Sequence, residues 1–214
     1  MSNPVQYRIF HSGVTPLACF SGSALLIMAS DRLAHAITAT GALVWVYCLS
    51  SLAAHIGARI FPRQGRTVLL AFLTSFIAGL YLLLLWILSP ICALESFFII
   101  SLVPMFCMVS GIFRQLETLN MDDAFAAACS EALILGALIA IFALIREPFG
   151  FLSLSLPGGT QGIILLFSFK IESFLPIRLI ASSAGALLLL GYFLGLYRYF
   201  RTQYGLREGH HNDF

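Results

Sequence analysis

The sequence predicts an all-α membrane protein with six transmembrane helices, arranged as a 3+3 inverted repeat with broken first and fourth helices. Three observations predict this fold. First, the 214 residues are 59% hydrophobic and 10% charged, with a mean hydropathy of +0.93, whereas soluble domains carry roughly 25% charged residues. Second, six apolar stretches approach the roughly 20 residues that a spanning helix requires. Third, each half contains Pro-x-x-Cys with Ser-Gly just beyond it, at Pro16–Gly22 and Pro104–Gly111.

The six predicted spans follow one another with mostly short connections. The first is short with Gly and Pro near its start, and the fourth contains Pro104, so both are expected to be interrupted because proline removes a backbone donor. No small-residue cleavage site follows a compact apolar core, so the first stretch is expected to stay as an anchor rather than be removed as a signal peptide. In order, the spans are Val14–Ser30, Leu33–Gly57, Thr67–Leu88, Cys92–Phe113, Ala124–Ile145 and Leu179–Tyr199.

The connections carry local signals of their own. Arg59–Arg66 is a basic turn with Pro and Gly, and Gln115–Asp123 is a polar connector. Glu147–Ile177 is the long connection, and "LSLSLPGGTQG" within it has clear turn chemistry. The apolar run Ile163–Phe169 is too short to span, so we expect an interfacial or re-entrant piece there.

We expect one membrane domain over residues 1–200, with repeat 1 at about 12–90, repeat 2 at about 91–200, and a polar tail at 201–214. The net charge of +2 gives no indication of a nucleic-acid partner. Short cytoplasmic loops are enriched in Lys and Arg, and the side that carries both termini holds most of them, so both termini are predicted to be cytoplasmic. That side holds Arg8, Arg59, Arg63, Arg66, Arg114, Arg198, Arg201 and Arg207, and the other holds Arg32, Arg146, Lys170 and Arg178.

The two Pro-x-x-Cys segments begin the two triplets of spans. Because three is odd, the second triplet crosses in the opposite sense to the first, and a pseudo-two-fold axis would bring the interrupted helices to a common depth. Cys19 and Cys107, each about one turn after its proline, would then face the gap between them. The alternative is that both are packing residues, since a buried Cys usually behaves as a small hydrophobe.

The remaining cysteines give no metal-site pattern, because neither C-x-x-C nor a zinc-type Cys/His spacing occurs. Cys48 and Cys129 lie within apolar helices and are interpreted as packing residues. Cys92 follows Pro90 near the end of a span, with no partner evident from the sequence. No Walker loop, G-x-S-x-G, H-E-x-x-H or G-x-G-x-x-G occurs, so a self-contained enzyme of the soluble type is not expected.

Charged residues inside a span are functional hypotheses by default. Glu131 belongs to a possible ion path, or it is a helix-start carboxylate near the membrane surface. His35 and His55, near the ends of the second span, are interpreted as side chains that reach the interface. Arg146-Glu147, followed by Pro148 and Gly150, is interpreted as the end of the fifth span, where the arginine could also anchor at headgroups.

Three stretches, Gly13–Ala18, Ile100–Gly111 and Arg146–Gly150, resemble motifs of the six-span integral subunits of the Rnf and Na⁺-translocating NADH:quinone oxidoreductase complexes, and more closely of the RnfE/NqrD branch. Gly13–Ala18 follows that family's G-[LV]-C-P-x-L-A, and Ile100–Gly111 follows its I-x-L-I-V-T-N-C-I-V-x-G. Arg146–Gly150 matches the R-E-x-x-G that ends the family's fifth span. The long loop and the Pro176 segment before the last span also fit, and the likeness covers roughly Asn3–Phe200.

The resemblance implies a subunit of an ion-translocating redox complex in a bacterial inner membrane, which is not catalytic alone. It would relay electrons across the bilayer through a mid-membrane [2Fe-2S] cluster shared with a paralogous RnfA/NqrE-like six-span subunit. Other subunits of the complex would carry flavin and Fe–S centres. Cys107 falls on the family's second cysteine position.

The chain departs from the family at the first cysteine position, where Thr15 stands, and at Phe106, where the family has Asn. Fe–S clusters are held by Cys with His exceptions. Cys19, one turn after Thr15, could supply the missing thiolate; alternatively three thiolates and another ligand hold the cluster, or the subunit is structural and binds none. A solute or ion carrier built on inverted repeats is the rival function.

Overall fold

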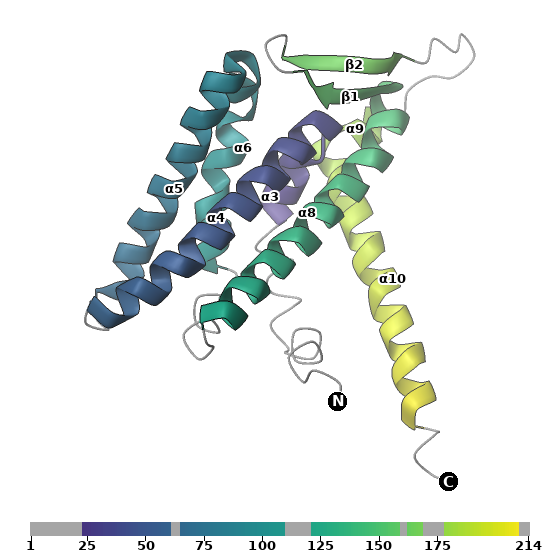
Figure 1. The fold of residues 1–214 in the computed structure, drawn as a ribbon. Coiled ribbons are helices and arrows are strands. Elements are labelled where there is room, and N and C mark those ends of the chain that lie inside the picture. Colours follow the sequence, from purple (N-terminus) through teal and green to yellow (C-terminus); the bar gives the residue numbers. More distant parts are fainter. Residues whose placement is uncertain (1–22, 61–64, 110–120, 159–161, 169–177, 210–214) are drawn as a thin grey trace.

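The computed structural model describes residues 23–60, 65–109, 121–158, 162–168 and 178–209 (Figure 1). These residues are mostly helical. The elements are α3 (Ser23–Ala29), α4 (Leu33–Ile60), α5 (Arg66–Leu88), α6 (Pro90–Val109), α8 (Met121–Phe151), β1 (Ser153–Pro157), β2 (Ile163–Ser168), α9 (Arg178–Ala181) and α10 (Ser183–Gly209).

Four of these helices are long and apolar enough to cross a membrane: α4, α5, α6 and α8. They confirm the second to fifth predicted spans. The start of the first predicted span lies outside the described residues, and its described end forms the short helix α3. The apolar part of α10 covers only Ser183–Leu196. Pro104 lies inside α6, which continues past it to Val109, so the expected interruption does not occur at that residue.

Ser89 explains the tight connection between α5 and α6, which lie side by side (Figure 1). It takes an extended conformation that ends α5. Its hydroxyl then accepts a hydrogen bond from the backbone N–H of Cys92 at 3.4 Å, in the manner of an N-cap. Pro90 follows at the first helical position, where a missing N–H is tolerated.

Helices α4 and α8 lie side by side along most of their length at the centre of the molecule and pack closely through small side chains (Figure 1). Gly136 is the tightest point, because a β-carbon there would collide with Thr40. The Thr40 hydroxyl lies 3.3 Å from the Gly136 carbonyl oxygen. Small residues at every fourth position let two backbones approach in a membrane. On α8 this buried stripe is Ala124, Ala128, Ala132 and Gly136.

Large apolar side chains cover the outside of the bundle. On α5, Phe72 is 75% exposed and Ile87 74% exposed. Hydroxyls lie inside instead, and the side chains of Thr38 on α4 and Ser96 on α6 are hydrogen-bonded at 3.1 Å. An outer surface of this kind is matched by lipid and not by water, so the fold indicates a helical membrane protein.

The all-α prediction is wrong between α8 and α9, where β1 and β2 form an antiparallel hairpin. The predicted turn is confirmed, because the Gly158 N–H donates to the Gly162 carbonyl at 2.6 Å. Gly162 has φ +81°, which favours glycine. Strand β2 is the run that we interpreted as interfacial or re-entrant. Leu and Ser alternate in 152–156, and this period of two is the pattern of a half-buried strand.

Candidate functional site

Arg146, near the end of α8, is the most heavily hydrogen-bonded side chain that the structure describes. It is 1% exposed. Its Nη1 donates to the Ile27 carbonyl at 2.9 Å and to the Ser30 hydroxyl at 2.6 Å. Its Nε donates to the Ile180 carbonyl at 3.2 Å, and its Nη2 donates to the Ala181 and Ser182 carbonyls at 3.0 and 3.3 Å. All the N–H donors of the guanidinium are therefore used.

These acceptors belong to the ends of two short helices. Ile27 and Ser30 mark the end of α3, and the other carbonyls lie where α9 gives way to α10. The last carbonyls of a helix have no partner within that helix. Arg146 supplies the missing donors at both places, so it joins α3, α8 and α9. The interpretation of Arg146 as a headgroup anchor is wrong, because the side chain is turned into the protein.

The Glu147 side chain accepts a hydrogen bond at the start of a helix, whereas Arg146 donates hydrogen bonds at helix ends. Its side chain is fully buried, and its Oε2 accepts a hydrogen bond from the backbone N–H of Leu33, the first residue of α4, at 2.8 Å. The first N–H groups of a helix also lack partners within the helix. Oε1 of Glu147 is buried and has no hydrogen-bond partner in the structure. The guanidinium next to it is engaged elsewhere, so this carboxylate is not in a direct ion pair with Arg146.

Gly150 completes the segment. A β-carbon there would lie 2.9 Å from the Ala181 β-carbon and 3.1 Å from the Ala181 backbone. Helix α8 continues through Pro148 to Phe151, so the prediction that the helix ends at Arg146-Glu147 is wrong by about one turn. Arg146, Glu147 and Gly150 thus each have a contact that explains their residue type. We name this region, with Ser30 and Leu33, the polar joint.

Asp31 and His35 lie beside the polar joint. Nδ1 of His35 is 2.7 Å from a carboxylate oxygen of Asp31, one helical turn away. Burial raises the pKa of Asp31, but the hydrogen bond and the charge of His35 lower it more, aided by the backbone of Arg32 and the charge of Arg146, so the net pKa is lower than usual. Asp31 is thus held ionised near the cationic side of the joint. The ring of His35 therefore has Asp31, just before α4, as its partner, and the interpretation of His35 as a side chain that reaches the interface stays a prediction.

Cys107 lies far along α6 and is completely buried. The Tyr47 side chain of α4 lies beside its thiol, and Glu131 of α8 is close enough to act on it electrostatically. The rings of Tyr47 and Phe106 are 6.4 Å apart, so Phe106 takes part in the same contact. Three central helices therefore meet at this thiol.

Glu131 is partly buried three turns into α8, which begins at Met121. The interpretation as a helix-start carboxylate is therefore wrong. Its place inside the apolar part of a spanning helix is compatible with the possible ion path.

Cys48 and Cys129 are joined by a disulfide, with α-carbons 5.8 Å apart. The interpretation of both as packing residues is therefore wrong. Neither spacing nor periodicity could have paired them, because they lie 81 residues apart. Cys92 is buried at the start of α6 and lies outside any disulfide. Cys19 and Thr15 lie outside the described residues.

The described residues fit a shared [2Fe-2S] cluster in one respect. Cys107 offers a thiol in dry surroundings with a hydroxyl beside its sulfur, and hydrogen bonds to sulfur are one means of tuning such clusters. The described part of the chain contains no group of three or more His, Cys, Asp or Glu residues that could hold a metal ion. A cluster would therefore need thiolates from outside that part.

No protein-family model matches the chain, and no curated protein matches it either. The fold and its apolar surface indicate the class, a helical membrane protein with several spans.

Proposed function

We propose that the chain is a membrane subunit of an ion-translocating redox complex of the Rnf/Nqr type and relays electrons across the bilayer. The polar joint carries the proposal. The motif shared with that family, R-E-x-x-G, coincides with Arg146, Glu147 and Gly150, whose contacts join four helices. A motif that only marked a helix end would not require these three residue types. The joint therefore supports common ancestry with the family.

The helix contacts support the proposed 3+3 repeat. In such a repeat, each helix of the first triplet (α3, α4 and α5) has an equivalent in the second triplet (α6, α8 and α10). The equivalent pairs would be α3 and α6, α4 and α8, and α5 and α10. Contacts α3–α6 and α4–α8 join the members of a pair. The contact α5–α6 then corresponds to α10–α3, and α4–α6 corresponds to α8–α3, and all four occur. These four contacts are expected of a pseudo-two-fold axis in the membrane plane, whereas the contact α4–α5 has no counterpart of similar extent between α8 and α10 in the described residues.

Cys107 is the proposed ligand from the second repeat, and Cys19 is the proposed ligand from the first, where Thr15 replaces the family's cysteine. A [2Fe-2S] cluster shared with a paralogous six-span subunit would supply one-electron transfer when bound. The chain's own contribution would be to hold Cys107 in dry surroundings, with Tyr47 beside the sulfur. Partner subunits would carry the flavin and the other Fe–S centres. The proposed location is a bacterial inner membrane with both termini in the cytoplasm.

The test is anaerobic purification of the complex from native membranes, followed by analysis of iron and acid-labile sulfide. Wild type, Cys107→Ser and Cys19→Ser are compared, with Cys92→Ser as the matched control because Cys92 is also buried on α6. We expect a second six-span subunit to co-purify, and we expect iron to be lost in the first two variants and retained in the control. Iron lost only in Cys107→Ser would exclude Cys19 as a ligand. An assembled wild-type complex without iron would refute the electron relay.

Glu131 favours a second candidate, an ion or solute carrier. A carboxylate three turns into a helix that could span a membrane is a functional hypothesis by default, and ion paths are one use of such carboxylates. A carrier would move its ion through the isolated chain in liposomes, and Glu131→Gln would abolish the flux. An electron-relay subunit would show no such flux without its partners.

A further inference from the structure

Cys48 and Cys129 connect the two helices at the centre of the fold. Their α-carbon separation of 5.8 Å lies within the range that a disulfide requires, so the bond forms without movement of the backbones. The small residues of α4 and α8 hold the two helices close on their own account. The reduced pair would therefore stay in place, with both sulfurs ready to react.

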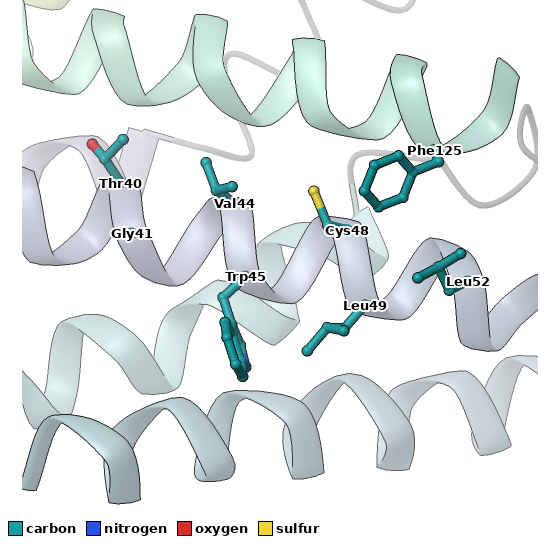
Figure 2. A pocket seen from close by; sticks show the side chains of 8 residues that line it. All are labelled: Thr40, Gly41, Val44, Trp45, Cys48, Leu49, Leu52 and Phe125. Atoms are coloured by element: carbon teal, nitrogen blue, oxygen red, sulfur yellow. The ribbon is translucent and has the colours of Figure 1, made fainter. Parts of the chain in front are cut away.

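The site can be reached from the membrane. Cys48 forms part of the wall of an open groove of about 530 Å³ along α4, and Phe125 of α8 closes one side. Figure 2 shows the Cys48 sulfur pointing from α4 toward α8, with Phe125 beside it. Apart from Thr40, whose hydroxyl is bonded to backbone carbonyls, the lining is apolar and carries no charge: Gly41, Val44, Trp45, Leu49 and Leu52.

This lining selects the reagents that can reach the sulfur. A charged group loses several kcal/mol or more when it leaves water without a partner. Charged soluble thiols such as glutathione are therefore excluded, whereas small neutral molecules that dissolve in lipid can enter.

We propose that Cys48 and Cys129 form a reversible thiol–disulfide site that reacts with small neutral hydroperoxides from the membrane and locks α4 to α8 when oxidised. The sulfur of one thiol attacks the O–O bond while its proton passes to the departing oxygen, so the thiol becomes a sulfenic acid and the peroxide leaves as an alcohol or water. The second thiol displaces water from the sulfenic acid and closes the S–S bond. Overall, two thiols and ROOH give a disulfide, ROH and water. A neutral dithiol restores both thiols and is itself oxidised to a disulfide. The inference goes beyond the proposed function and does not depend on it.

The test counts thiols on the full chain in sealed native membrane vesicles. Vesicles are treated with hydrogen peroxide or with dithiothreitol, washed, denatured, and labelled with a maleimide that adds a fixed mass per thiol. The chain has five cysteines. We expect the peroxide sample to carry two labels fewer than the dithiothreitol sample. Wild type that carries the same number of labels after both treatments would overturn the proposal.

Three variants assign the change. Cys48→Ser and Cys129→Ser should each abolish the difference of two labels, and two separate variants protect the test against one that does not fold. Cys92→Ser is the matched control and should keep the difference. Persistence of the difference in Cys48→Ser or Cys129→Ser would overturn the assignment to this pair.

A last comparison tests whether reductants reach the disulfide through the apolar groove. After oxidation, neutral dithiothreitol should restore the two labels in intact vesicles, whereas the charged phosphine TCEP should restore them only after denaturation. Equal action of TCEP on intact vesicles would overturn access through the apolar groove.

Discussion

Replacement of Arg146 by lysine isolates the contribution of the polar joint, because it keeps the positive charge and shortens the list of donors. An ammonium group has three N–H donors, whereas the guanidinium has five. At least two of the acceptors now bound by Arg146 would therefore lose their partner. The side chain is 1% exposed, so water cannot easily replace the lost donors.

The magnitude follows from these counts. A buried acceptor left without a partner costs about 1–3 kcal/mol, so two lost partners give a destabilisation of about 2–6 kcal/mol for Arg146→Lys. Arg32→Lys is the matched control at the same end of α4. The Arg32 guanidinium lies 5.8 Å from the centre of the Phe151 ring, and a cation over a ring contributes about 0.5–1 kcal/mol at exposed sites, which a lysine largely keeps.

The assay is unfolding of the purified chain in mixed micelles with increasing SDS, followed by the reaction of its buried thiols with a fluorogenic maleimide. Cys92 and Cys107 are buried in the folded protein and report on its opening. We expect Arg146→Lys to unfold with a midpoint at a lower SDS content than wild type, and Arg32→Lys to unfold at the wild-type midpoint. A free energy of unfolding for Arg146→Lys within about 0.5 kcal/mol of wild type would refute the joint as a source of stability, since surface substitutions change stability by that amount.

Three further predictions concern the same region. Gly150→Ala should destabilise the fold by about 1–3 kcal/mol in the SDS assay because the new methyl group would press on Ala181. Gly79→Ala on α5 is the control: its methyl group would meet open space, so it should be neutral or stabilising by up to about 1 kcal/mol. Equal effects of the two substitutions would contradict this prediction. Glu147→Gln should keep a side-chain oxygen that accepts the Leu33 N–H, whereas Glu147→Ala removes this cap, which is worth about 1 kcal/mol. We therefore expect the glutamine variant to lose less stability than the alanine variant. A larger loss in the glutamine variant would be inconsistent with capping. Because the folded pKa of Asp31 is below its ordinary value of 3.8, its stabilisation is present above that value and is lost as pH falls through the folded pKa; acid melting curves of Asp31→Asn should lack this loss, and curves that match wild type would disprove it.

The positions of the long helices were predictable because a spanning helix leaves a direct signal in composition. Four of the predicted spans were confirmed, since about 20 apolar residues in a row have few alternatives. The ends were less predictable. Helix α8 passes through Pro148 because that residue is held between Glu147 and Gly150, whose contacts lie on other helices. Local stop signals cannot include such contacts.

The candidate site was predictable only in part. The sequence shows the Arg146-Glu147 motif, but the burial of Arg146 depends on carbonyls of α3 and α9 that are more than 30 residues away in the chain. The Cys48–Cys129 bond depends on the packing of α4 against α8, which hydropathy does not encode. The small residues at every fourth position of α8 are visible in the sequence and indicate a close contact with another helix.

The proposal of an electron-relay subunit is tested most directly by EPR spectroscopy of the anaerobically purified complex after reduction with dithionite. We predict a [2Fe-2S] signal in wild type and in Cys92→Ser, and no such signal in Cys107→Ser, with all three complexes assembled to the same extent. A signal that survives in Cys107→Ser, or an assembled wild-type complex that gives none, would contradict the role of Cys107 as a cluster ligand.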